Sequence, residues 1–168
     1  MINPCGILPW GIQPRLYNNQ KKKMKMKLHH IGKVVKDLEE ARLYYHQTFG
    51  LEAWGEPVID PIQKVEVLLL NTGYGAEVTI ELIRPLGEDS PVYRFLEKKG
   101  GGLHHLSFAV EDIHAAISYL ESQGAKILGD IVPSTAHQSN PSAWLYTSSR
   151  ELVELIEINS SPDVQPVQ

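Results

Sequence analysis

A pair of adjacent histidines occurs twice in this chain, each time at the start of an apolar run. The segment LHHIGKVVKDLEEA (28–41) is matched 75 residues later by LHHLSFAVEDIHAA (103–116), with six identities in fourteen positions. Imidazole nitrogens bind transition metals, so a repeated histidine pair predicts a site to which both copies of the repeat contribute.

A glutamate follows each histidine pair at a similar distance. The segment TIELI is matched by LVELI, which aligns Glu81 with Glu154. The spacing is 51 residues from His30 to Glu81 and 49 residues from His105 to Glu154. Both glutamates lie between apolar neighbours in strand-like segments, where a buried carboxylate is costly unless a cation or a donor faces it. Each copy therefore supplies one histidine and one glutamate.

Two imidazoles and two carboxylates form a mixed nitrogen and oxygen set, which suits Zn²⁺, Mn²⁺, Co²⁺, Ni²⁺ or Fe²⁺. Strand alternation places the two histidines of each pair on opposite faces. We therefore predict that one divalent metal ion is bound by His30, Glu81, His105 and Glu154. The first histidines of the pairs, His29 and His104, are expected to pack against the helices or to hydrogen-bond locally. The histidines outside the repeat are expected to face solvent: His46, His114 and His137.

The elements that would carry these residues recur in the same order. After the first strand, Asp37 with Glu40 resembles a capping box, and a helix is expected to run to a stop at Gly50. Three strands follow, and after a short helix the same series begins again. The expected strands are 28–35, 51–58, 64–71, 76–84, 103–110, 125–132, 142–148 and 151–158, and the second long helix is 112–123. This order predicts an α+β fold made of two paired βαβββ modules.

Charge is distributed unevenly along the chain. Residues 1–27 contain six basic and no acidic residues, whereas the rest contains ten basic and twenty acidic residues, a net charge of −10. An acidic body argues against nucleic acid as a partner. No apolar run is long enough to span a bilayer, which argues against an integral membrane protein. Cys5 is the only cysteine, so a disulfide framework is excluded and a reducing, cytoplasmic location is expected.

The ends of the chain are expected to lie outside the fold. Residues 1–27 contain three prolines and lack sustained periodicity, so they predict a disordered extension, a segment upstream of a start at Met24 or Met26, or a targeting peptide. Residues 159–168 are expected to form a second tail. The folded domain would then be 28–158, with modules at 28–86 and 103–158 joined by 87–102.

The repeat and its linking segment resemble the vicinal oxygen chelate superfamily, which includes glyoxalases, extradiol dioxygenases and bleomycin-resistance proteins. Within it, the segment PLGEDSPVYRFLEKKGGGLHHLSF is most similar to the methylmalonyl-CoA epimerases, and HHIGKVVKDLEEARLYYHQTFGLE is shared more broadly. The resemblance covers about 28–158. It implies that the two modules form a half-open barrel around one metal ion, and its ligand positions fall on the same two histidines and two glutamates.

Some positions depart from the epimerase pattern. Many epimerases carry glutamine where this chain has Glu81. A carboxylate that some epimerases use as a base corresponds to Val67 here. The last hairpin, STAHQSNPSAWLYTSSRELVEL, lacks the glycine-rich loop and the His-Pro-Lys turn of that family. The acyl-CoA substrate is therefore a weaker inference than the fold or the metal.

The resemblance implies an isomerase that removes a proton next to the carbonyl of a small-molecule substrate, an acyl-CoA thioester such as methylmalonyl-CoA. One divalent ion, Co²⁺, Ni²⁺, Mn²⁺ or Zn²⁺, would act as a Lewis acid on the enolate. Glu154 is the expected catalytic base and Glu81 the second candidate. By analogy with the superfamily, a homodimer is expected.

Two other functions are compatible with the sequence. A glyoxalase I-type lyase (lactoylglutathione lyase-like) would share the metal and a ligand set made only of histidine and glutamate. A non-catalytic small-molecule or drug-binding protein would use the paired modules as a cleft without a metal, lined by Tyr44, Tyr45, Trp54, Tyr74, Trp144 and Tyr146. An extradiol dioxygenase is disfavoured because its iron site has one carboxylate, and a second would crowd the positions that oxygen needs.

Overall fold

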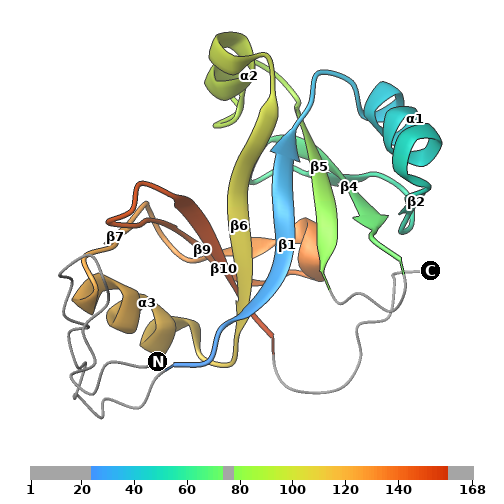
Figure 1. Ribbon diagram of the computed structural model, residues 1–168. Coiled ribbons are helices and arrows are strands. Elements are labelled where there is room, and N and C mark those ends of the chain that lie inside the picture. Colours follow the sequence, from blue (N-terminus) through green and yellow to red (C-terminus); the bar gives the residue numbers. More distant parts are fainter. Residues whose placement is uncertain (1–23, 74–77, 159–168) are drawn as a thin grey trace, which may run out of the picture.

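The computed structural model describes residues 24–73 and 78–158, in which the elements form two series of the same order (Figure 1). Module 1 consists of β1 (Lys27–Val34), α1 (Leu38–Phe49), β2 (Glu52–Ala53), β3 (Val58–Asp60), β4 (Val65–Asn71) and β5 (Thr79–Pro85). Helix α2 (Tyr93–Lys99) lies in the linking segment. Module 2 consists of β6 (Gly102–Val110), α3 (Ile113–Ser122), β7 (Lys126–Ile127), β8 (Val132–Ser134), the 3₁₀ turn η1 (Thr135–His137), β9 (Asn140–Tyr146) and β10 (Leu152–Glu157).

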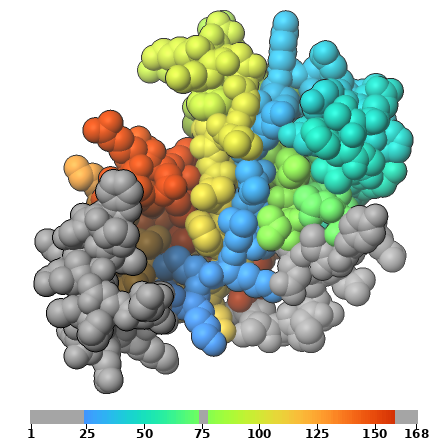
Figure 2. Space-filling view, viewed as in Figure 1, coloured from blue at the N-terminus to red at the C-terminus, as the bar shows by residue number. Residues whose placement is uncertain are grey.

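A ten-stranded sheet runs through both modules in the order β2-β4-β5-β1-β6-β10-β9-β7, with β3 paired to β4 and β8 to β9. Strands β1 and β6 are antiparallel and join the modules at the centre, where they are blue and yellow in Figures 1 and 2. Each is flanked by a parallel strand of its own module, β5 beside β1 and β10 beside β6. The sheet is curved and, among the described residues, its outer strands β2 and β7 do not pair with each other. The predicted α+β fold with an unclosed sheet is confirmed.

One long helix in each module begins at an aspartate cap. The side chain of Asp37 accepts the backbone N–H of Glu40 at 2.8 Å, and that of Asp112 accepts the N–H of Ala115 at 2.9 Å. The two aspartates are 75 residues apart, so the cap belongs to the repeat and starts both helices in the same way. Helix α1 stops where predicted, at Gly50, whose φ of 68° is left-handed.

An apolar core lies beneath each of these helices. Beneath α1 it includes Leu38, Leu68, Leu70 and Leu82, and beneath α3 it includes Ile113, Ala116, Leu145 and Leu155. Full burial of one such aliphatic side chain contributes about 1.5–3 kcal/mol, so each core holds its half of the sheet firmly against its helix. The strands that carry the predicted site residues are thereby fixed on both sides of the centre.

Each central strand contains a bulge at the first histidine of its pair. The pairing of β1 with β6 skips His29 on one strand and His104 on the other. A bulge inserts one residue into a strand and turns the side chains there away from strict alternation. The prediction that these two histidines lie on the opposite face from their neighbours is therefore wrong. Each hydrogen-bonds locally to the adjacent histidine, which was one of the two expected arrangements.

Two of the predicted strands are interrupted in the structure. The segment 51–58 forms β2 and the first residue of β3, and the segment 125–132 forms β7 and the first residue of β8. Gly55 and Gly129, which lie between these short strands, both have a φ of 87°. A left-handed residue ends an extended segment, and glycine adopts that conformation without strain.

The predicted tails fall largely outside the described residues, which begin at Met24 and end at Ile158. Residues 74–77, which belong to the predicted turn after β4 and the start of the next predicted strand, also lie outside them. Within the described part of the chain, the search for a helix long and apolar enough to span a bilayer found none.

Candidate metal centre

The four residues predicted to bind a metal converge at the centre of the molecule. They come from four adjacent strands: His30 from β1, His105 from β6, Glu81 from β5 and Glu154 from β10. All four are buried, with at most 5% of their surface exposed. The two Nε2 atoms are 3.0 Å apart. Glu81 Oε2 lies 3.3 and 3.6 Å from Nε2 of His30 and of His105, and Glu154 Oε2 lies 3.3 and 3.8 Å from the same atoms.

The strand register explains how four long side chains meet in one place. Two rows of neighbouring residues cross the central strands, and in each row a small residue separates two predicted ligands. The rows are Glu81–Gly32–His105 and His30–Ser107–Glu154. The imidazole of His105 lies directly over Gly32, where any Cβ atom would overlap the ring. The position of His105 therefore requires glycine at residue 32.

The spacing of the donor atoms suits a metal ion. With bonds of about 2.1 Å, donor atoms around a tetrahedral or octahedral ion lie about 3.0–3.4 Å apart. The imidazole nitrogens and the carboxylate oxygens at this site are separated by 3.0–3.8 Å. Glu154 Oε2 is buried and has no hydrogen-bond partner among the described residues. A buried carboxylate oxygen without a donor favours a cation as its partner.

The carboxylates make this site strongly negative. Burial alone would lower the pKa of His30, but Glu81 and Glu154 outweigh it and raise that pKa to about 10. Burial also opposes ionisation of Glu81, yet His30 and His137 hold the pKa of its carboxyl well below the usual range. At His105 burial prevails and lowers the pKa to about 3. A site that keeps a buried carboxylate ionised and draws a proton onto the neighbouring imidazole also attracts a divalent cation.

His29 and His104 form an outer layer beside the inner histidines. Nε2 of each inner ring faces the carboxylates, so its Nδ1–H donates outward. His30 Nδ1 lies 2.9 Å from Nδ1 of His29, and His105 Nδ1 lies 3.1 Å from Nδ1 of His104. Burial lowers the pKa of both outer rings, that of His29 to about 3, so they are neutral acceptors. Outer partners of this kind fix the tautomer of a ligating histidine.

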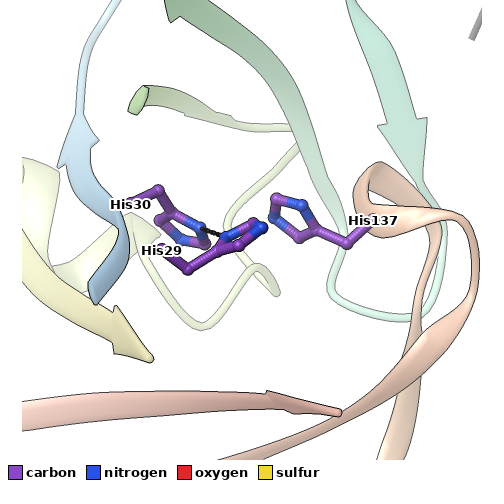
Figure 3. Close-up of side chains that lie close together, drawn as sticks. All are labelled: His29, His30 and His137. Carbon is purple, nitrogen blue, oxygen red and sulfur yellow. Dashed lines mark hydrogen bonds between the residues drawn. The ribbon is translucent and has the colours of Figure 1, made fainter. Parts of the chain in front are cut away.

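His137 belongs to the same cluster, and the prediction that it faces solvent is wrong. It lies at the end of η1 and is 7% exposed. Its Nε2 lies 3.1 Å from Glu81 Oε1, and its ring stacks on that of His30 with centroids 4.8 Å apart. Figure 3 shows His137 reaching the histidines of β1 from a separate loop. The other two histidines outside the repeat, His46 and His114, are exposed as expected.

A cavity of about 420 Å³ opens onto this cluster. Its polar end includes Glu81, His105 and Glu154, and its walls include the apolar side chains of Val65, Val67, Ile83, Val92 and Trp144. Among the described residues, no lysine or arginine lines it. The volume and the concentration of polar groups at one end are typical of a small-molecule site.

The match to known proteins agrees with this geometry. The family model of the Glyoxalase/Bleomycin resistance protein/Dioxygenase superfamily matches residues 29–141. That span begins at the first histidine pair and crosses the centre of the sheet into module 2. The chain belongs to this superfamily. Its paired modules and central histidines are therefore features of a superfamily member.

Epimerases of this superfamily are similar over most of their length. An ethylmalonyl-CoA/methylmalonyl-CoA epimerase of Cereibacter sphaeroides is 38% identical over 135 residues, which are 79% of this chain and 98% of the relative. The crystal structure of methylmalonyl-CoA epimerase from Mycobacterium tuberculosis has a TM-score of 0.70 at 30% identity, covering 78% of this chain and 87% of that one. A methylmalonyl-CoA epimerase in complex with methylmalonyl-CoA and NH4+ has a TM-score of 0.70 at 26% identity, covering 86% of this chain and 100% of that one.

Two buried residues of this superfamily member escaped the sequence reasoning, Asp60 and His137. Asp60 is 1% exposed and accepts the backbone N–H groups of Ile62, Gln63 and Thr135. Asp60 and Thr135 are 75 residues apart, so the repeat offset contained a signal for this contact between the modules. The position equivalent to His137 is Ile62, and the repeat therefore carried no signal for the additional histidine.

Proposed function

We propose that this protein is a metal-dependent epimerase that acts on an acyl-CoA thioester such as methylmalonyl-CoA. The observation that carries the proposal is the convergence of two buried imidazoles and two buried carboxylates at the polar end of an apolar cavity. The similarity to acyl-CoA epimerases over most of the chain supports the substrate class.

His30, Glu81, His105 and Glu154 would hold the ion, for which Co²⁺, Ni²⁺, Mn²⁺ and Zn²⁺ are the candidates. When bound, a divalent ion supplies positive charge that stabilises an enolate formed next to the thioester carbonyl. The described lining of the cavity contains no lysine or arginine. The side chains of this lining therefore bring no permanent positive charge of their own to the substrate oxygens.

We assign removal of the α-proton to Glu154. It lines the cavity, and its Oε2 has no hydrogen-bond partner in the described part of the chain. That oxygen can therefore turn toward the substrate without breaking a hydrogen bond. Glu81 also lines the cavity and is the second candidate for carrying a proton, but its other oxygen is bonded to His137. Val67 occupies the position where the epimerase resemblance implied a different base, and it offers none.

The apolar walls of the cavity suit the rest of the substrate. The side chains of Val65, Val67 and Ile83 offer contact to the alkyl group next to the carbonyl. Trp144 places its ring edge-on to His105, with centroids 4.6 Å apart. Apolar walls exclude water from the reacting centre, where electrostatic stabilisation of an enolate is then stronger.

A glyoxalase I-type lyase is the second candidate function. The specific observation in its favour is that both carboxylates at the centre are glutamates, as in the ligand set expected for such a lyase. Both reactions begin with removal of a proton next to a carbonyl, so the cluster suits either. A purely ligand-binding cleft is disfavoured, because Trp144 is the only one of the candidate cleft aromatics that lines the cavity among the described residues, and Tyr74 lies outside them.

Two assays on the protein reconstituted with Co²⁺ or Zn²⁺ separate these functions. The first follows racemisation of (2S)-methylmalonyl-CoA in D₂O and the entry of deuterium at C2. The second follows the hemithioacetal of methylglyoxal and glutathione. We expect metal-dependent racemisation in the first and no turnover in the second. The opposite pattern would support the lyase, and activity in neither assay would contradict both enzymes.

A homodimer and a cytoplasmic location complete the proposal. Multi-angle light scattering of the purified chain measures the first, and a fluorescent fusion of the full chain in its native cell measures the second. A monomer, or a signal confined to an organelle, would overturn the respective expectation.

A further inference from the structure

We propose that His137 is a positioning residue that fixes Glu81 as the permanent carboxylate ligand of the metal ion, so that Glu154 is the carboxylate free to move. This inference rests on the metal centre proposed above and extends it to a residue that does not line the cavity. Three observations carry it: the hydrogen bond of His137 to Glu81, the confinement of its ring, and the anchoring of the turn that carries it.

The hydrogen bond divides the two oxygens of Glu81 between two tasks. His137 Nε2 lies 3.1 Å from Oε1, while Oε2 lies 3.3 Å from Nε2 of His30. An ionised carboxylate only accepts hydrogen bonds, so Nε2 of His137 carries the proton and donates it. With Oε1 held in this way, Glu81 presents Oε2 alone to the other predicted ligands. A hydrogen bond to the second oxygen is a common way to orient a ligating carboxylate.

The ring of His137 has little freedom. It lies 13° from parallel to the ring of His30 at a centroid distance of 4.8 Å, and it meets the ring of His29 edge-on at 5.0 Å. Figure 3 shows the three rings together. Because His137 is 7% exposed, its donor is held in a single direction, toward Glu81. A confined donor orients its partner more strongly than one on a mobile surface side chain.

The turn that carries His137 is tied to the module that carries Glu81. Asp60 of β3 accepts the backbone N–H of Thr135, the first residue of η1, through Oδ2 at 2.9 Å. The other oxygen of Asp60 accepts two N–H groups of its own loop at 2.9 Å each. Asp60 is 1% exposed, so this carboxylate is a buried connection between the modules. His137 is thereby positioned over module 1 although it belongs to module 2.

The other carboxylate has no equivalent partner. The position that corresponds to His137 in module 1 is Ile62, which is 51% exposed and cannot donate a hydrogen bond from its side chain. Glu154 Oε2 has no hydrogen-bond partner within the described residues. The clamp is therefore one-sided, and this one-sidedness determines which of two otherwise equivalent glutamates stays in place.

The test measures binding of Co²⁺ to the full chain by competition titration and records the visible absorption spectrum of the bound ion. We expect His137→Ala to weaken Co²⁺ binding about 10- to 100-fold and to shift the spectrum, because Glu81 is no longer held by one oxygen. His137→Gln keeps an N–H donor and should recover most of the affinity and the spectrum of the unmodified protein. His114→Ala replaces an exposed histidine and is the matched control, expected to leave both unchanged.

A second variant removes the anchor without touching the cluster. Asp60→Asn has nearly the same size but only one accepting oxygen, so it should weaken Co²⁺ binding by a smaller factor than His137→Ala. If the unmodified chain binds no Co²⁺, both the metal centre and this inference are wrong. If it binds Co²⁺ and folded His137→Ala has the same affinity and spectrum, only this inference is wrong. Should His137→Ala fail to fold, equal Co²⁺ affinity of Asp60→Asn and the unmodified chain overturns the inference, and weaker binding supports it.

Discussion

Glu81 and Glu154 end equivalent strands in the two modules, yet their surroundings differ. Glu81 accepts a hydrogen bond from His137 through one oxygen, whereas Glu154 has a buried oxygen without such a partner among the described residues. The small residues between the ligands differ as well, since Gly32 lies against the ring of His105 and Ser107 lies between His30 and Glu154. Duplication alone would give a symmetric site with two interchangeable carboxylates.

The difference shows how a duplicated fold acquires directional chemistry. Proton transfer next to a carbonyl needs a base that can approach the substrate and a framework that stays in place. In this protein the framework is the pair of histidines with Glu81, and the mobile group is Glu154. The asymmetry arises outside the repeated strands, in the turn that ends at His137.

The largest expected effect separates the two glutamates directly. Glu154→Gln should lower kcat of the metal-loaded protein by about 10²–10⁴-fold, because a neutral amide cannot remove a proton. Glu81→Gln keeps an oxygen ligand and should lower kcat by much less. Deuterium entry at C2 of methylmalonyl-CoA, measured at saturating metal, gives both values. Equal losses in the two variants would contradict the division of roles.

The residues between the ligands give the next comparison. Gly32→Ser copies the residue that module 2 has at the equivalent position, but its Cβ would overlap the ring of His105. Displacement of that ring should weaken metal binding by about 100-fold, the upper end of what supporting residues contribute. Ser107→Ala removes a buried hydroxyl that has no hydrogen-bond partner in the described chain and should change binding little. Competition titration with Zn²⁺ measures both, and tight binding by Gly32→Ser would exclude this geometry.

The two inner histidines should also differ in their protonation. Without metal, His30 has a pKa raised to about 10 and His105 a pKa lowered to about 3. Between these values only His30 is charged, so metal binding near pH 7–8 should release about one proton, and affinity should rise about tenfold per pH unit below pH 10. Calorimetry in buffers of different ionisation enthalpy counts the protons, and ¹⁵N spectra of the imidazoles identify the charged ring. Release of no proton, or a charged His105, would show that the rings have been assigned wrongly.

The smallest expected effects test where the modules are alike. Asp37→Ala and Asp112→Ala each remove the side-chain acceptor at the start of a helix. Each should lower the free energy of unfolding by about 1 kcal/mol, with no change in metal affinity. Denaturant titration of the two variants should give similar losses. A loss confined to one module would show that the helices do not stabilise their halves of the sheet equally.

The sequence contained most of the site because the repeat aligned it twice. Each of His30, Glu81, His105 and Glu154 had a counterpart in the other half, and apolar neighbours indicated that the glutamates are buried. The βαβββ order and the helix stop at Gly50 were also predictable from local patterns.

Features that depend on one copy alone, or on breaks in regular structure, were not predictable in this way. His137 has no counterpart, so nothing in the spacing distinguished it from a surface histidine. The bulges at His29 and His104 invert the alternation on which face predictions depend, and they arise from the pairing of two strands 75 residues apart. Glycine bends at Gly55 and Gly129 divide segments that read as continuous strands.

The central claim is that both modules bind one divalent ion together through four side chains. The most direct measurement is the anomalous difference map of crystals of the cobalt-loaded protein, collected at the cobalt edge. The account predicts one peak per chain, bonded to Nε2 of His30, Nε2 of His105, Oε2 of Glu81 and Oε2 of Glu154. A peak bound by residues of a single module, or only at the protein surface, would contradict it.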